Sequence, residues 1–239
     1  MAPGTSVIVT AFNEADRIGE TLAALALAFP GATLWVADDG STDRTSEIAR
    51  EAGARVVRSE RTIGKGEAAT PAARQALRQA RERSPGAGGG AQSGEVEAVF
   101  VLCDGDLAGS ARELGPLVDP IRRGQADIAV AVFARRVGGG LGLAVGFARW
   151  AIRRRCGLAT RAPLSGQRAV SARALADVLP FAHGFGMEVG MTIDAVRCGH
   201  RLLEVELDLE HRASGRTLAG FVHRARQLAD VVRASLRRR

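Results

Sequence analysis

Two aspartates, Asp104 and Asp106, follow an apolar segment that runs from Glu97 to Leu102. In an extended chain, residues two apart point to the same side, so both carboxylates can reach one ligand. Carboxylate oxygens suit hard divalent cations such as Mg²⁺ or Mn²⁺, and such a cation can neutralise the charge that develops on a departing diphosphate. Taken alone, this pattern also fits a turn, or the start of a helix capped by Ser110.

A second acidic cluster, Asp38 to Asp43 (DDGSTD), follows the apolar segment from Ala32 to Ala37. Carboxylates at that point can hydrogen-bond a ribose hydroxyl or the imide of a nucleotide base. Because Ser, Thr and Asp are also the preferred helix caps, a capped turn is the alternative interpretation.

Lys65 is the single lysine of the chain, in which every other fixed cation is an arginine. It stands between Gly64 and Gly66, and glycines allow the backbone to approach a ligand closely. An ammonium is a compact point charge that suits phosphate. A solvated loop lysine is the alternative.

Strand-like and helix-like segments alternate along the first 133 residues. This alternation predicts an α/β fold with a mainly parallel sheet and right-handed crossovers, in which ligands bind beyond the carboxyl ends of the strands. The polar clusters all fall at such ends. The expected strands are 5–10, 32–37, 54–58, 97–102 and 127–133, and the expected helices are about 14–29 (capped by Asn13), 44–52, 66–83 and 110–123.

The second half of the chain is less regular. A glycine-rich segment, Gly138 to Gly142, precedes a basic amphipathic helix expected from Leu143 to Arg155, with Phe147 and Trp150 on its apolar side. A short helix is expected after 164–170, then a helix within 184–198, a strand within 202–209 and an amphipathic helix over 218–238.

Composition limits the functional classes. The chain has 239 residues, 46% of them hydrophobic, which suits one globular domain. Its apolar runs are too short for a membrane span, and a basic start followed by an apolar stretch is lacking, so we expect a cytoplasmic protein. Three widely spaced cysteines argue against a disulfide framework or a zinc site. The net charge of +7 favours phosphate-bearing ligands, anionic lipid surfaces or nucleic acid.

Together, four motifs resemble the donor half of glycosyltransferase family 2, over about residues 5 to 135: Thr10 to Glu14, Asp38 to Asp43, Gly64 to Gly66 and Asp104 to Asp106. The resemblance implies the GT-A fold, an α/β/α nucleotide-diphospho-sugar transferase sandwich, with a UDP- or GDP-sugar as co-substrate and Mg²⁺ or Mn²⁺ as cofactor. It implies one domain, about 1–135 for the donor and about 136–239 for the acceptor. The donor-binding residues that it implies are Thr10, Ala11, Phe12, Glu14, Asp38, Asp39, Lys65, Asp104 and Asp106.

Within that set, the resemblance assigns the nucleoside to Ala11, Glu14 and Asp39, and the diphosphate and ribose to Lys65 and Asp104. The resemblance also implies that Asp106 is the main carboxylate ligand of the metal, with Asp104 beside it. His211, in a late loop, completes the metal shell by analogy with other GT-A enzymes; a core or surface histidine is the alternative.

The second half resembles the polyprenyl-phosphate (dolichyl-phosphate) sugar transferases, a narrower group. The resemblance lies in the glycine-rich segment, the basic helix after it and the segment Leu164 to Ala169 (LSGQRA), where Gln167 replaces the usual aromatic residue. It implies a polyprenyl-phosphate acceptor and peripheral contact with the inner membrane surface. The arginines expected to contact the acceptor phosphate are Arg149, Arg168, Arg212 and Arg216.

Glu188, at the start of its helix, is the candidate catalytic base, together with Asp106 as the other catalytic residue. A hydroxyl acceptor needs a carboxylate to take its proton, whereas a phosphate acceptor is already anionic and leaves Glu188 only an orienting role. Stabilisation of the helix N-terminus is the alternative role for this charge. We expect sugar transfer with inversion at the anomeric carbon.

Three other functions fit parts of the sequence. The first is the same donor chemistry with a small soluble phosphate or hydroxyl acceptor, with retention as an option. The second is a nucleotidyltransferase, which would normally carry a glycine- and arginine-rich loop after the first strand, where this chain has Ala11 to Glu14. The third is a nucleic-acid binder that uses the arginines, but the absence of tyrosine and an aromatic content of 4% provide few stacking platforms. We therefore expect no nucleic-acid partner.

Overall fold

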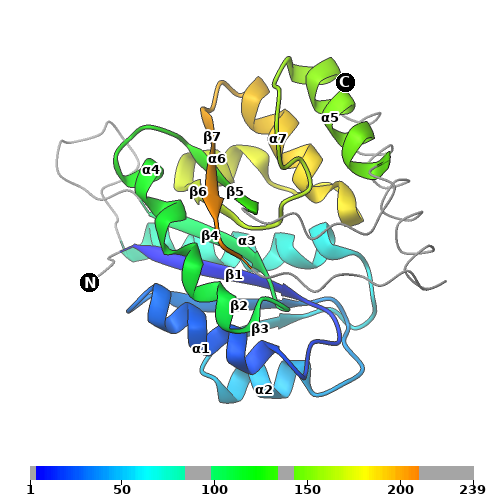
Figure 1. Ribbon diagram of the computed structural model, residues 1–239. Coiled ribbons are helices and arrows are strands. Elements are labelled where there is room, and N and C mark those ends of the chain that lie inside the picture. The colour runs from blue at the N-terminus through cyan, green and yellow to red at the C-terminus, as the bar shows by residue number, and fades with distance from the viewer. Residues whose placement is uncertain (1–3, 84–97, 134–142, 210–239) are drawn as a thin grey trace.

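The computed structural model describes residues 4–83, 98–133 and 143–209. The chain alternates strands and helices in the order drawn in Figure 1. The strands are β1 (Thr5–Ala11), β2 (Thr33–Asp38), β3 (Arg55–Arg58), β4 (Val99–Asp104), β5 (Ile128–Phe133), β6 (Arg168–Ser171) and β7 (Leu202–Leu207). The helices are α1 (Ile18–Ala28), α2 (Thr45–Glu51), α3 (Lys65–Arg83), η1 (Ala108–Val118), α4 (Asp119–Arg122), α5 (Leu143–Cys156), α6 (Ala172–Val178), η2 (Gly184–Gly186) and α7 (Met187–Arg197).

The described strands form one mixed sheet in the order β3-β2-β1-β4-β6-β5-β7. All neighbours pair in parallel except those of β6, which runs antiparallel to both β4 and β5. The parallel register aligns Thr10 with Asp104 and Ala11 with Asp38. The carboxyl ends of β1, β2 and β4 therefore lie side by side, as the sequence predicts for the donor half.

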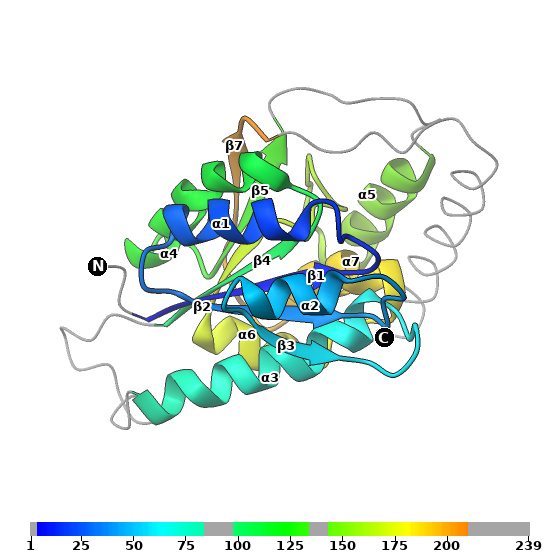
Figure 2. The ribbon, with the colours of Figure 1, turned by 90° about the horizontal axis from the view of Figure 1, so that it is seen from below.

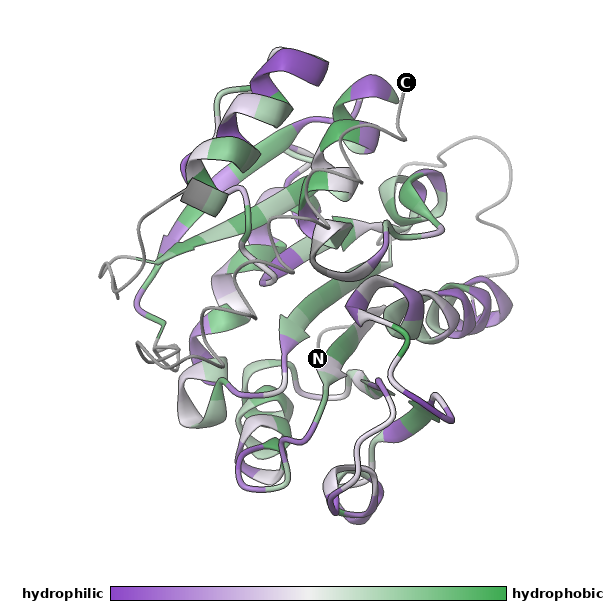
Figure 3. Cartoon of the chain, turned by 90° about the vertical axis from the view of Figure 1, so that its right-hand side faces the viewer, coloured by the Kyte–Doolittle hydropathy of each residue, from purple (hydrophilic) through white to green (hydrophobic). Residues whose placement is uncertain are grey.

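Two apolar layers hold helices against the sheet. One contains Val7 and Val9 of β1 and packs under α1 and η1, and the other contains Ile8 and packs under α3, α6 and α7. Alternate residues of β1 thus face opposite layers, as the period of a strand requires. Figure 2 shows α1 and α4 on one side of the sheet and α3 and α6 on the other. In Figure 3 the strands are mainly hydrophobic, whereas the outer helices carry hydrophilic faces.

A third, smaller cluster joins α5 to α7. Ala148 and Ile152 of α5 are fully buried against Val189 and Ile193 of α7. The basic helix that the sequence predicts is therefore present, and the side with Ala148 and Ile152 packs on another helix of the protein. Trp150, which the sequence predicts for the apolar side, does not lie on this buried side. Trp150, on α5, is 59% exposed and contacts Phe147, with 5.4 Å between the ring centroids.

The segment 164–170 leads into the short helix α6, as the sequence predicts, and its end belongs to β6, a short antiparallel strand that the sequence does not predict. Two local expectations are corrected. Asn13 does not cap α1, which begins at Ile18; its backbone has a φ of 55° and its side chain accepts from the N–H of Thr42. The helix expected to be capped by Ser110 is instead a 3₁₀ helix that starts at Ala108. The helix expected over 218–238 lies outside the described residues.

Within the described ranges, none of the helices combines the length and apolar character that crossing a bilayer requires.

Gly66 should be intolerant of any side chain. A Cβ at this position would lie 1.8 Å from the carbonyl oxygen of Ala182, in backbone that cannot move aside cheaply. We expect Gly66→Ala to lower the melting temperature by several degrees, although alanine is the better helix former. Gly146→Ala in α5 is the matched control, because a Cβ there meets no atom within 4 Å. It should be neutral or stabilise by up to about 1 kcal/mol. Equal melting temperatures for the two variants in thermal unfolding would contradict this packing.

Candidate active site

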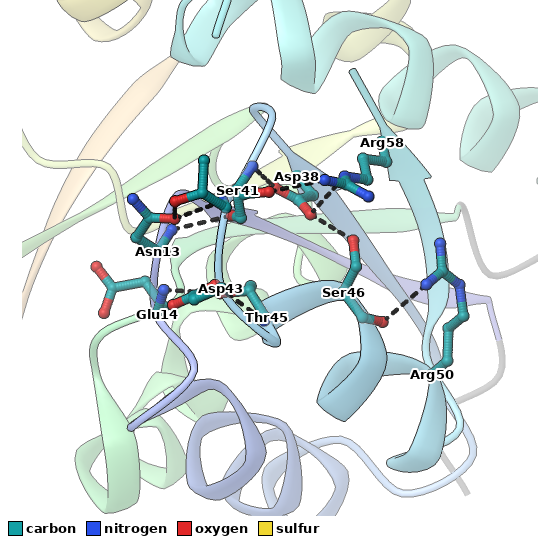
Figure 4. Close-up of polar contacts among 10 residues, drawn as sticks. Asn13, Glu14, Asp38, Ser41, Asp43, Thr45, Ser46, Arg50 and Arg58 are labelled. Atoms are coloured by element: carbon teal, nitrogen blue, oxygen red, sulfur yellow. Dashed lines mark hydrogen bonds and ion pairs between the residues drawn. The ribbon is translucent and has the colours of Figure 1, made fainter. Parts of the chain in front are cut away.

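The loops after β1 and β2 are joined by hydrogen bonds (Figure 4). The N–H of Asn13 donates to Ser41 Oγ at 2.9 Å, and the N–H of Glu14 donates to Thr45 Oγ1 at 2.8 Å. In return, Asn13 Oδ1 accepts from the N–H of Thr42 at 2.8 Å. The two loops that the sequence assigns to the nucleoside are therefore one hydrogen-bonded unit.

Asp43 strengthens this junction. Its carboxylate accepts from the N–H and the hydroxyl of Thr45, and from the N–H of Ala15 across the junction at 3.1 Å. Burial acts to raise the pKa of Asp43, but the hydrogen bonds from Thr45 and Ala15 outweigh it and lower the pKa. The group is therefore an anion that accepts hydrogen bonds at neutral pH.

Asp38 and Asp39 have different environments although they are adjacent. Asp38 has no exposed surface; its carboxylate accepts from the N–H of Ser41 and the hydroxyl of Ser46 and pairs with Arg58 Nε at 3.6 Å. These contacts of the buried Asp38 carboxylate fix the loop after β2. Asp39 is 8% exposed and accepts from the N–H groups of Ile63 and Gly64 at 2.7–3.1 Å.

The contact between Asp39 and the loop after β3 fixes the turn directly before Lys65. Gly40 makes this approach feasible, because its φ is +75° and a Cβ there would lie 2.5 Å from the backbone of Arg61. Lys65 is the first residue of α3, so Asp39 holds the turn that delivers the lysine to the centre of the sheet edge.

At this centre, the Lys65 ammonium lies between two carboxylates. Its Nζ is 2.6 Å from Asp104 Oδ1 and 2.6 Å from Glu188 Oε1. Burial acts to lower the pKa of Lys65, but the charges and hydrogen bonds of Asp104 and Glu188 overcome it and raise the pKa above its ordinary value. Lys65 is consequently a permanent cation that joins the end of β4 to the start of α7.

Asp104 is held from further directions. Gln167 Nε2 donates to Asp104 Oδ2 at 2.8 Å, and Thr10 Oγ1 donates to Asp104 Oδ1 at 3.2 Å. Gly166 passes directly over this group, since a Cβ there would lie 2.8 Å from both Asp104 Oδ2 and Lys65 Nζ. The residue before Gln167 must therefore lack a side chain for the network to close.

The turn that carries Asp106 is fixed by β1 and α1. The N–H of Gly105 donates to the carbonyl of Thr10 at 2.9 Å, and the hydroxyl of Thr21 donates to the carbonyl of Gly105 at 2.8 Å. Arg17 donates to the backbone carbonyl of Asp106 at 3.2 Å. A rigid backbone is thereby provided for the second aspartate of the pair.

The chemistry of this pair fits a hard divalent cation. Asp104 and Asp106 present carboxylate oxygens, the ligand type that Mg²⁺ and Mn²⁺ prefer. Within the described ranges, three or more His, Cys, Asp or Glu side chains do not gather into a complete metal-binding group. The third predicted ligand, His211, lies outside those ranges. Protein donors engage both oxygens of Asp104, and the metal-binding roles expected of Asp104 and Asp106 stay predictions.

The structure brings together most of the residues predicted for the donor. Six of them meet at the sheet edge, and Glu188 joins them from α7. The six are Thr10, Ala11, Asp38, Asp39, Lys65 and Asp104. Phe12 is 45% exposed beside them. Arg149 is exposed on α5 and its guanidinium donates to the carbonyl of Arg161. Arg212 and Arg216 lie outside the described residues.

Arg168 and Gln167 differ most from their predicted roles. Arg168 is 1% exposed, inside the protein, so an internal role is the one that its geometry supports; the acceptor contact expected of it stays a prediction. Gln167 stands in the sequence only as a departure from an aromatic residue, yet its amide binds Asp104. No periodicity signals that contact, because it joins residues 63 positions apart.

Replacing Lys65 should make stability depend on pH. In Lys65→Met, Asp104 and Glu188 lose their shared cation and are left as two neighbouring anions, which repel each other. Protonation relieves this repulsion, so the variant should lose more melting temperature at pH 8 than at pH 5. In the wild type, the stabilisation by Lys65 is present below the pKa of an unfolded lysine and is lost only above the raised folded pKa, so it is constant over this range.

Lys65→Arg is the control for that measurement, because it retains a positive charge. Its loss of melting temperature should be similar at the two pH values. An equal loss for Lys65→Met at pH 5 and pH 8 would show that the two carboxylates do not share the lysine.

Comparisons with known proteins agree with the donor half. The family model described as "Glycosyl transferase family 2" matches residues 6–146. A glucosyl-3-phosphoglycerate synthase of Mycolicibacterium paratuberculosis is 32% identical over 252 residues, which cover 93% of this chain and 69% of the relative.

Solved structures of glucosyl-3-phosphoglycerate synthase from Mycobacterium tuberculosis share the fold. The structure with Mg²⁺ and UDP has a TM-score of 0.70 and 29% identity, and it matches 97% of this chain and 79% of the other. The structure with Mn²⁺, UDP-glucose and phosphoglyceric acid has a TM-score of 0.67 and 28% identity, with the same coverage. These comparisons confirm the predicted fold class.

The same relatives correct one expectation. They are named glucosyl-3-phosphoglycerate synthases and one of them is in complex with phosphoglyceric acid, so they do not support the predicted polyprenyl-phosphate acceptor. They favour the alternative with a small soluble acceptor, and they favour a glycosyltransferase over a nucleotidyltransferase or a nucleic-acid binder. The family model matches more than half of this chain, and the site at the strand ends agrees with that match. This chain therefore belongs to glycosyl transferase family 2 and is a glycosyltransferase.

Proposed function

We propose that this protein transfers glucose from UDP-glucose to a hydroxyl of a small phosphorylated acceptor of the 3-phosphoglycerate type. The observation that carries the proposal is the Lys65 ammonium between Asp104, at the end of a donor-half strand, and Glu188, at the start of an acceptor-half helix. Relatives with the same fold have been solved with UDP-glucose and phosphoglyceric acid, which supports this donor and this class of acceptor.

The joined loops after β1, β2 and β3 form the donor side. We assign the nucleoside to Ala11, Glu14 and Asp39, with the exposed ring of Phe12 beside them. Asp38 has no exposed surface, so we give it the task of fixing its loop instead of touching the donor. A loop shaped before the nucleotide arrives lowers the entropic cost of binding.

Mg²⁺ or Mn²⁺, bound by Asp106 and His211, would supply positive charge to the leaving UDP. Lys65 adds a second cation from the protein itself. An ammonium has three N–H donors, and hydrogen bonds to Asp104 and Glu188 use two of them. We assign the third to a donor phosphate, and the raised pKa of Lys65 keeps it protonated while it does so.

Glu188 is 5% exposed and one of its oxygens accepts from Lys65. A hydroxyl acceptor must lose its proton as it attacks the anomeric carbon, and we assign that proton to the Glu188 carboxylate. Attack on the side opposite to the departing UDP would invert the anomeric carbon, as first expected. Attack on the same side would retain its configuration, and the anomeric proton of the product distinguishes the two outcomes by NMR.

The acceptor requires a site for its phosphate. Arg149 supplies an exposed guanidinium near the start of the acceptor half. Of the three other arginines predicted for this role, Arg168 is buried, and Arg212 and Arg216 are the two that we assign to the phosphate. An arginine can bind phosphate with two parallel hydrogen bonds, which would orient the acceptor as well as attract it.

The direct test is transfer from radiolabelled UDP-glucose to three acceptors: 3-phosphoglycerate, glycerol 3-phosphate and polyprenyl phosphate in vesicles. We expect a glucosylated product with 3-phosphoglycerate, dependent on added Mn²⁺ or Mg²⁺. Product only with polyprenyl phosphate would overturn the proposed acceptor, and product with none of the three would overturn the proposed reaction.

Two variants test the assigned roles. Asp106→Asn should lower kcat at least about a hundredfold, because it weakens the stabilisation of the leaving group. Glu188→Gln should nearly abolish transfer to a hydroxyl, but would only weaken transfer to a phosphate oxygen. Glu51→Gln, an exposed change on α2, is the control and should be neutral. Turnover of Glu188→Gln close to that of the control would remove Glu188 from the reaction.

A further inference from the structure

Arg168 is the largest fully buried side chain among the described residues, at 1% exposure. It lies on β6, between β4 and β5. Burial lowers the pKa of its guanidinium to about 10, against the opposing influence of Glu188 and Glu204. The group therefore still carries its positive charge at neutral pH, in the interior of the acceptor half.

The guanidinium connects two segments of the chain. Its Nε donates to the backbone carbonyl of Ser165 at 2.9 Å, and one terminal nitrogen donates to Thr192 Oγ1 at 2.9 Å. The Thr192 hydroxyl donates in turn to the backbone carbonyl of Glu188, also at 2.9 Å. A continuous line of hydrogen bonds thus runs from Ser165 through Arg168 and Thr192 to Glu188.

Both ends of this line carry site residues. Ser165 precedes Gly166 and Gln167, and the Gln167 amide holds Asp104 at 2.8 Å. Glu188 pairs with Lys65 at 2.6 Å. The spacing between the Gln167 turn and the first turn of α7 therefore determines how Asp104 and Glu188 meet on Lys65.

Stability does not account for a buried charge at this position. The second terminal nitrogen of Arg168 is buried without a hydrogen-bond partner among the described residues. Removing a cation from water is costly, and apolar side chains of similar volume often replace buried ionic groups without loss of stability. The geometry that Arg168 imposes on the two segments is the better explanation for a buried charge at this position.

We propose that Arg168 is a positioning residue, which sets the spacing between the Gln167 turn and the start of α7, and thereby the placement of Glu188 for the reaction. This inference rests on the proposed function, because Glu188 acts as a base only if the acceptor must lose a proton. It assigns Arg168 no contact with substrate.

The test compares wild type with Arg168→Met, Thr192→Val and Thr192→Ser. Arg168→Met keeps the apolar stem and removes the charge, whereas Thr192→Val keeps the shape and removes the hydroxyl. We expect both to lower kcat about tenfold or more, since small misplacements of a reacting group are costly, while UDP affinity in the presence of Mn²⁺ changes less than twofold. Thr192→Ser restores the hydroxyl and should recover most of kcat.

A merely structural role predicts a different pattern. It would lower the melting temperature and weaken UDP binding in step with kcat, which would overturn the proposal. Arg168→Met with kcat within twofold of wild type, or Thr192→Val as fast as Thr192→Ser, would also overturn it. If Arg168→Met does not fold, the two Thr192 variants decide alone. Arg74→Met, an exposed change on α3, controls for the loss of an arginine.

Hydrogen exchange separates this proposal from the proposed function. Arg168→Met should speed amide exchange in both residues 163–167 and residues 187–191, with residues 5–11 of β1 unchanged. If the wild type transfers no glucose, the proposed function fails, and exchange still judges the connection. Unchanged exchange in the two segments would overturn it whatever the activity.

Discussion

The site depends on the position of one ammonium group. Lys65 lies 2.6 Å from each of two carboxylates that are 84 residues apart in the chain, Asp104 on β4 and Glu188 on α7. Without the cation, these two anions would repel each other. The two ion pairs of Lys65 therefore join the end of β4 to the start of α7.

The surrounding loops hold Lys65 in place through hydrogen bonds that join each loop to the next. Hydrogen bonds from Asn13 and Glu14 join the loop after β1 to the loop after β2, and Asp39 of that loop accepts from the backbone of Ile63 and Gly64. The turn that precedes Lys65 is thereby tied, through the loop after β2, to the loop after β1. Each connection uses a short polar side chain on backbone, a contact that loses little side-chain entropy.

The donor half could be predicted from the sequence because its signals are local. Alternating apolar segments indicate parallel strands, and the register then places Thr10 beside Asp104. The acceptor half gives weaker signals. The strand β6 has four residues, and its partners on both sides run antiparallel to it, so neither its length nor its neighbours follow from the local pattern. Gln167 and Arg168 act through contacts distant in sequence, which a periodicity cannot reveal.

The burial of charge distinguishes this site from an ordinary surface cleft. Lys65, Glu188 and Arg168 are all largely removed from water, and desolvation opposes the charge on both cations. Such a cluster costs stability unless its members are well paired, and the two apolar layers of the sheet must offset that cost. In return, electrostatic interactions are stronger in a dry site than in water, and groups that are already oriented need not rearrange as charge develops on the leaving nucleotide. The polar network is therefore best understood as preorganisation for the reaction. The hydrophobic layers stabilise the fold enough to offset the free energy that burying these charges costs.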